Sequence, residues 1–126
     1  MTTKHQVLYV EDNPANMRLV EQLLKTFPDI VLIGAETAEE GIDIASQQNP
    51  DLILMDINLP GMNGYEALVE LQKMDATKTI PVVAISANAL ASDLEKGRAA
   101  GFADYITKPI NLQSFFETIK KHLDIS

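Results

Sequence analysis

The feature that most constrains the fold is the apolar run Leu52–Met55, which has Asp51 before it and Asp56 after it. A short apolar run bounded by turn signals, here the Pro60-Gly61 pair, is typical of a strand that is buried on both faces. Such strands occur inside parallel sheets, whose faces are both covered by helices. We therefore expect Asp56 at the carboxyl end of a parallel strand, the edge at which open α/β sheets bind ligands.

Strand-like and helix-like patterns alternate along the chain without a linker or a low-complexity tract. The expected strands are residues 7–10, 31–35, 51–56, 81–86 and 103–107. The expected helices are 14–27, a helix opened by a capping box at Thr37 and Glu40, a helix after Asn63-Gly64, and helices at 91–100 and 112–123. We expect 1–126 to form one domain, and no output domain to follow it.

This alternation predicts βαβ units and a parallel sheet between two layers of helices. Right-handed crossovers favour a flavodoxin-like (βα)5 three-layer sandwich with five parallel strands in the order 2-1-3-4-5. In that order the strand ends bring together five residues that are distant in sequence: Glu11, Asp12, Asp56, Ser86 and Lys108. The sequence therefore predicts a site at one edge of the sheet.

Composition excludes several classes of function. The 18 acidic residues outnumber the 10 basic ones, and the net charge of −8 argues against direct nucleic-acid binding. The absence of cysteine excludes disulfides, a thiol nucleophile and a cysteine zinc site. No run approaches the length of a membrane span, so we expect a cytoplasmic protein without membrane contact. His5 and His122 are expected at the surface, without a metal or phosphorylation role.

The expected cluster has a definite chemistry. Carboxylates that crowd together raise one another's pKa unless a cation neutralises them. Hard oxygen ligands without histidine or cysteine suit Mg²⁺, and an ionised aspartate beside Mg²⁺ can attack phosphorus. Lys108 can then pair with the incoming phosphoryl group while the Ser86 hydroxyl bonds one of its oxygens.

With these elements in place, the whole chain resembles the receiver domain of two-component response regulators. The matching features are the acidic pair Glu11-Asp12, Asp56 followed by Pro60-Gly-Met-Asn-Gly64, the hydroxyl in Ala84-Ile-Ser86-Ala87, and Lys108-Pro109. The resemblance implies that Asp56 accepts a phosphoryl group from phosphohistidine on a histidine kinase or histidine phosphotransfer protein. It also implies that Asp12, Asp56 and the backbone carbonyl of Asn58 hold Mg²⁺, with Glu11 contributing through water.

Further roles follow from the same resemblance. Ser86 and Tyr105 resemble the family's switch pair, and the Lys108–Pro109 bond is expected to be cis. Asn58 and Asn88 occupy positions that tune the lifetime of the phosphoryl group. A histidine-bearing helix bundle is expected to dock on the start of the first helix, at Asn13, Pro14, Asn16 and Met17.

The fourth helix, fifth strand and fifth helix are expected to signal to a downstream protein or to a second copy, so that the protein is a monomer or a phosphorylation-dependent dimer. The amino-acid sequences of residues 10–16 and Ser86–Ala89 also resemble those of receivers attached to hybrid histidine kinases. A free-standing regulator and a module of a larger kinase both stay open.

Three alternatives are weighed against this interpretation. A magnesium-dependent phosphatase of the haloacid-dehalogenase type needs an aspartate two residues after its nucleophile, where this chain has Asn58, and it needs a cap domain. A flavodoxin needs small and hydroxyl residues where this chain has the acidic loop 11–14. A receiver-like module that is never phosphorylated has usually lost the acidic pair, the acceptor or the lysine. The expected function is a switch with slow self-catalysed hydrolysis and no turnover of a metabolite.

Overall fold

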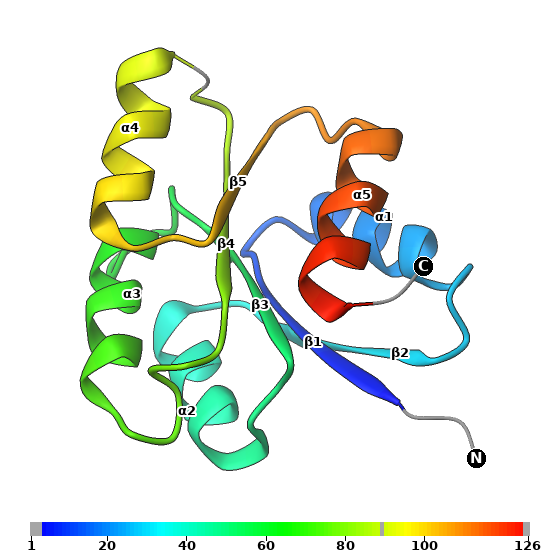
Figure 1. Cartoon of the computed structure of the whole chain (residues 1–126), viewed down its shortest axis with the longest axis horizontal. Helices are drawn as coiled ribbons and strands as arrows, with labels where there is room; N and C mark the ends of the chain where they lie inside the picture. The colour runs from blue at the N-terminus through cyan, green and yellow to red at the C-terminus, as the bar shows by residue number, and fades with distance from the viewer. Residues whose placement is uncertain (1–3, 89, 125–126) are drawn as a thin grey trace.

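The computed structural model describes residues 4–88 and 90–124, in which strands and helices alternate (Figure 1). The strands are β1 (His5–Val10), β2 (Ile30–Ala35), β3 (Leu52–Asp56), β4 (Val82–Ser86) and β5 (Asp104–Thr107). The helices are α1 (Pro14–Leu24), α2 (Ala38–Gln48), α3 (Gly64–Lys73), α4 (Ala91–Ala100) and α5 (Leu112–Leu123). Bounds differ from the expected ones by only a few residues.

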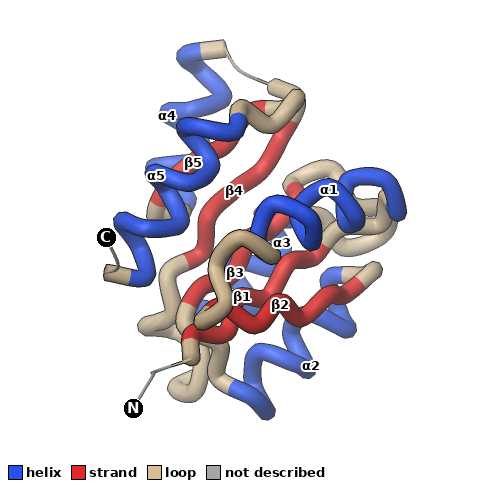
Figure 2. The backbone as a smooth tube through the Cα atoms, turned by 90° about the vertical axis from the view of Figure 1, so that its right-hand side faces the viewer, coloured by secondary structure: helices blue, strands red, loops and turns tan. Residues whose placement is uncertain are grey.

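The strands form one parallel sheet of order β2-β1-β3-β4-β5, which confirms the predicted flavodoxin-like topology. Helices α1 and α5 cover one face and α2, α3 and α4 the other, as Figures 1 and 2 show from two sides. All five residues of β3 and all five of β4 are buried, as expected for central strands covered on both faces.

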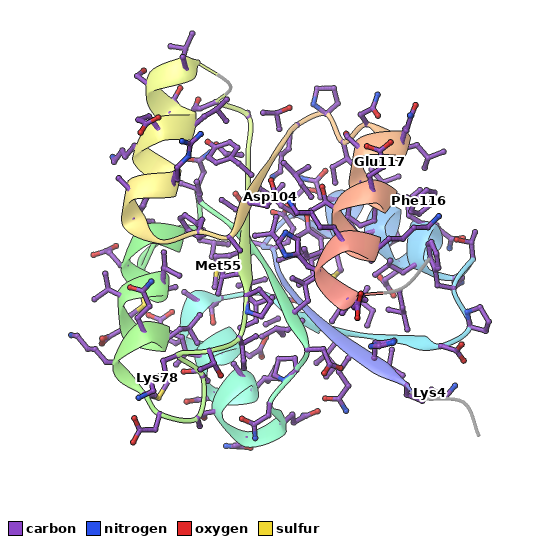
Figure 3. All side chains as sticks on the ribbon, viewed as in Figure 1. Lys4, Met55, Lys78, Asp104, Phe116 and Glu117 are labelled. Atoms are coloured by element: carbon purple, nitrogen blue, oxygen red, sulfur yellow. The ribbon has the colours of Figure 1, made fainter. Side chains whose placement is uncertain are left out.

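Two apolar clusters hold the layers together. Alternation along each strand sends side chains to opposite faces, so that Leu8 and Val10 pack toward α2 and α3 while Val7 and Tyr9 pack toward α1 and α5. Phe115 and Ile119 of α5 are fully buried. Phe116, labelled in Figure 3, is only partly buried. Its ring centroid lies 5.2 Å from that of Phe27.

Local signals set most helix ends. The side chain of Asn13 accepts hydrogen bonds from the amides of Ala15 and Asn16 at the start of α1, where Pro14 occupies the first turn. The helix ends at Leu24 instead of the expected Phe27. The amide of Phe27 donates a hydrogen bond to the Leu24 carbonyl at 3.0 Å, and the Phe27 ring packs on Phe116.

The predicted capping box at α2 is only half present. Thr37 Oγ1 accepts from Glu40 N at 3.1 Å, but the Glu40 carboxylate accepts from Glu36 N at 2.8 Å. A complete box opens α3 instead, where Asn63 and Glu66 accept from each other's backbone amides at 3.0 Å. No helix among the described residues is long and apolar enough to cross a membrane.

Candidate functional site

The carboxyl ends of β1, β3 and β5 meet at the predicted edge of the sheet. Glu11 directly follows β1, Asp56 is the last residue of β3, and Lys108 directly follows β5. Glu11 and Asp56 are 2% and 3% exposed, whereas Asp12 faces solvent. The structure therefore places two buried carboxylates below one exposed carboxylate.

Lys108 joins the two buried acids. Its Nζ lies 2.9 Å from Glu11 Oε1 and 3.2 Å from Asp56 Oδ2. The backbone amide of Lys108 donates to the Ser86 carbonyl at 2.8 Å, and the Lys108–Pro109 bond is cis, as expected. Burial opposes the ammonium charge, but bonds to the two carboxylates outweigh burial and raise the pKa of Lys108.

The two oxygens of Glu11 have different partners. Oε1 accepts from the Tyr9 hydroxyl at 2.8 Å as well as from Lys108, and Oε2 accepts from Asn13 N at 3.3 Å. Burial would raise the pKa of Glu11, but its interactions with Asp56, Lys108 and Tyr9 and the lysine charge lower that pKa to about 2. Glu11 is therefore ionised at neutral pH.

Asp56 has the opposite shift. The pKa of Asp56 is raised to about 6, mainly by burial and also by the interaction with Glu11. The Asn58 amide, which donates to Asp56 Oδ1 at 3.0 Å, and the charge of Lys108 oppose it. Two neighbouring carboxylates with divergent pKa values indicate a functional site.

The acidic residues could hold a cation. Glu11, Asp12 and Asp56 each offer an oxygen, and these oxygens lie within 4.8 Å of one another. Carboxylate oxygens are the ligands that Mg²⁺ prefers, and an accessible side at Asp12 leaves room for the waters that Mg²⁺ retains. The donor set therefore fits the expected metal.

The two expected switch residues are linked by Asn88. Ser86 Oγ accepts from Asn88 N at 3.1 Å, and the Tyr105 hydroxyl donates to the Asn88 carbonyl at 2.9 Å. Asn58 Nδ2 also donates to Ser86 Oγ, at 3.4 Å. These contacts bring the loops after β3 and β4 and strand β5 together. Ala89, the last residue of the expected motif, lies outside the described residues.

The sequence patterns did not predict three contacts that the structure shows. Tyr9 was assigned only to a strand, although its position two residues before Glu11 puts both on the same side of β1. The bridging role of Asn88 had no sequence signal, because it uses backbone atoms. His122 is not a simple surface residue: it is half-buried, with Nε2 3.2 Å from Asp104 Oδ2 on β5 (Figure 3 labels Asp104).

Comparisons with known proteins agree with this geometry. The family model described as the response regulator receiver domain matches residues 7–120. The chain belongs to this family. The polar-differentiation response regulator DivK of Brucella anthropi is 41% identical over 117 residues, which are 93% of this chain and 94% of the relative. The receiver resemblance read from the sequence is confirmed, and so is a place in two-component signalling.

Solved receivers have the same fold. The receiver domain of the sensor histidine kinase PA1611 from Pseudomonas aeruginosa PAO1, with a magnesium ion in its active-site cleft, superposes with a TM-score of 0.87. It is 30% identical, and the match covers 97% of this chain and 99% of that one. The receiver of Saccharomyces cerevisiae Ssk1, solved with the histidine phosphotransfer protein Ypd1, gives a TM-score of 0.84 at 28% identity, covering 96% and 90%. This receiver is thus a signalling module, and the phosphatase and flavodoxin alternatives are not favoured.

Proposed function

We propose that Asp56 of this receiver accepts a phosphoryl group from phosphohistidine on a histidine kinase or a histidine phosphotransfer protein. A P–O bond to Asp56 forms as the P–N bond to the imidazole breaks. The observation that carries the proposal is the position of Asp56 between the acidic pair and Lys108 Nζ, 3.2 Å away. Lys108 neutralises charge on the transferred group, and the Ser86 hydroxyl bonds one of its oxygens.

Mg²⁺ is the metal we propose for the acidic cluster. Asp12, Asp56 and the backbone carbonyl of Asn58 would hold it directly, and Glu11 through water. When bound, it supplies positive charge that offsets the repulsion between the carboxylates and the incoming phosphate. The magnesium ion reported in the PA1611 receiver supports this choice.

Phosphorylation would act as a conformational switch on a pre-existing equilibrium. The bonds of Ser86 and Tyr105 to Asn88 offer a physical connection from the site to β5. We propose that α4, β5 and α5 present the altered surface to a downstream protein, or to a second copy if phosphorylation causes dimerisation. Nucleic acid and membranes are not proposed as direct partners.

The start of α1 is the proposed docking surface for the phosphate donor. Asn13 and Pro14 are exposed beside the acidic pair, and Asn16 and Met17 are half-buried on the same turn. The Ypd1–Ssk1 complex shows that a receiver of this fold does meet a histidine phosphotransfer protein. A helix bundle resting on α1 would bring its histidine within reach of Asp56.

We further propose that 1–126 acts as one domain whose reaction is limited to self-phosphorylation and self-dephosphorylation. The competing function is an interaction module that is never phosphorylated. It is disfavoured because Glu11, Asp12, Asp56 and Lys108 are all retained. Whether the module is free-standing or part of a hybrid kinase does not alter this chemistry.

Intact-mass measurement after incubation with acetyl phosphate and Mg²⁺ tests the function. One phosphate adduct that hydroxylamine removes, absent from Asp56→Asn and without Mg²⁺, is the expected result. Asp51→Asn is the matched control: Asp51 lies at the opposite end of β3, bonded to Gln6 N at 2.8 Å, and its loss should leave phosphorylation intact. Failure with acetyl phosphate and with phosphorylated phosphotransfer proteins alike would favour the interaction module.

A further inference from the structure

Tyr9 brings a polar hydroxyl into the core near the carboxyl end of β1. It lies on β1 between Gly34 of β2 and Leu54 of β3, and its side chain is 0% exposed. Burying a phenol hydroxyl is unfavourable unless the hydroxyl is hydrogen-bonded. Its bond goes to Glu11 Oε1 at 2.8 Å, and no buried side-chain polar atom in the described part of the chain lacks a partner. An aliphatic residue would fill the strand without this requirement.

The Tyr9 hydroxyl and Lys108 Nζ bond the same oxygen of Glu11 from two different elements. Tyr9 belongs to β1 and to the core cluster and donates to Glu11 Oε1 at 2.8 Å, and Lys108, in the loop after β5, donates to it at 2.9 Å. The other oxygen, Oε2, accepts only a long 3.3 Å bond from Asn13 N among the bonds of the described residues. Oε2 is thus the Glu11 oxygen left to face a cation or a water on that cation.

Lys108 alone would hold Glu11 poorly. Its ammonium is shared with Asp56 Oδ2, and it ends a flexible four-carbon stem. A phosphoryl group on Asp56 would compete for the same ammonium. The phenol of Tyr9 is packed rigidly in the core, so its bond to Glu11 does not depend on the state of Asp56.

We propose that Tyr9 is a positioning residue for the metal site: it fixes the Glu11 carboxylate so that Oε2 is directed at Mg²⁺ or its water. This inference rests on the proposed Mg²⁺-dependent function. Partners that orient a metal-ligating carboxylate commonly contribute between ten- and a hundredfold to metal affinity. Because Glu11 is proposed to act through water, we expect the lower end of that range.

The test is a titration of the unphosphorylated protein with Mg²⁺. Backbone amide chemical shifts, measured by nuclear magnetic resonance, give the Mg²⁺ affinity. Tyr9→Phe should weaken Mg²⁺ affinity about tenfold while keeping the fold, since only the hydroxyl is removed. In the Glu11→Gln background the same substitution should have little further effect, because Tyr9 is proposed to act through the carboxylate.

Thr77→Val is the matched structural control. Thr77 is 1% exposed, and its hydroxyl donates to the Leu71 carbonyl at 2.6 Å in the loop between α3 and β4, away from the site. Its loss should lower stability in Mg²⁺-free buffer and leave Mg²⁺ affinity unchanged. A Tyr9→Phe protein that loses stability but binds Mg²⁺ normally, or more tightly, would overturn the proposal.

Failure of this inference can be told from failure of the proposed function. Wild type that binds Mg²⁺ and is phosphorylated, with Tyr9→Phe equal to it in both, overturns the role of Tyr9 alone. Wild type that binds no Mg²⁺ overturns both. If Tyr9→Phe does not fold, as its amide spectrum and thermal unfolding would show, Tyr9 is a structural residue and the positioning role is rejected.

Discussion

Asp56→Asn should stabilise the metal-free protein at neutral pH, because it removes a charge that the fold buries at a cost. The pKa of Asp56 rises from its ordinary value of 3.8 to about 6 on folding, mainly through burial. Each pH unit by which a pKa is displaced corresponds to about 1.4 kcal/mol, so the charge costs at most about 3 kcal/mol. Asparagine keeps an oxygen that can accept a hydrogen bond from the Asn58 amide, but it loses the ion pair with Lys108. We therefore expect the free energy of unfolding to rise by about 1 to 3 kcal/mol.

The sign of the pH dependence follows from the direction of the shift. Below 3.8 the carboxyl of Asp56 is protonated in both the folded and the unfolded chain, so it costs nothing. Between 3.8 and about 6 the unfolded chain ionises while the folded chain keeps its proton, and the cost of Asp56 grows with pH. Above about 6 the cost is complete. The advantage of Asp56→Asn should therefore appear as the pH rises through this window.

Urea unfolding in the presence of EDTA measures this advantage. Curves are compared for wild type, Asp56→Asn and Asp51→Asn, at one pH below the window and one above it. Asp51→Asn removes an equal charge from the exposed position directly before β3 and should bring no gain in stability. Equal differences between Asp56→Asn and wild type at both pH values, or no gain at the higher one, would refute the account. Saturating Mg²⁺ should reduce the difference in free energy of unfolding between Asp56→Asn and wild type, because it should stabilise wild type more than the variant.

Three other substitutions test separate parts of the structure. Lys108→Ala leaves two buried carboxylates without the ammonium and should cost about 2 to 4 kcal/mol in urea unfolding at neutral pH; a loss below about 0.5 kcal/mol would contradict the bridging role. Gly97→Ala should displace the ring of Tyr105, since a Cβ would lie 2.9 Å from Tyr105 Cδ2; an unchanged tyrosine ring spectrum with a more stable helix would argue against this. Gly101→Ala should cost more than about 1 kcal/mol in thermal unfolding, because φ is +113° and a Cβ would meet Gln72; a neutral effect would show that the turn relaxes.

The fold and the position of the site could be predicted because both depend on local patterns. Apolar runs such as Leu52–Met55 specify buried strands whatever surrounds them, and parallel connections bring their carboxyl ends to one edge. Glu11, Asp56 and Lys108 follow from that rule, although Lys108 lies 97 positions after Glu11. Element ends were less predictable: α1 stops early because Phe27 packs on a residue of α5, which no pattern within α1 encodes.

Contacts inside the site could not be predicted, because they depend on how far each side chain reaches in the folded protein and on bonds to backbone atoms. A strand pattern shows that Tyr9 and Glu11 share a side but not that a hydroxyl reaches a carboxylate. Likewise, Ser86 and Tyr105 are recognisable as residues of the family pattern, yet their connection runs through the amide and carbonyl of Asn88. Side-chain identity carries no information on such a backbone bridge.

The same electrostatics connects the stability of this receiver to its proposed switching. Glu11 and Asp56 are buried close together and share one lysine, so the raised pKa of Asp56 reflects carboxylate repulsion and burial that Lys108 does not fully offset. A divalent cation would relieve that repulsion, and the proposed phosphoryl transfer would redirect Lys108 and Ser86 toward new oxygens. Ser86 is already tied to Asn88, and Asn88 to Tyr105. Under the proposed function, a change of charge at Asp56 would therefore reach β5 through Ser86, Asn88 and Tyr105.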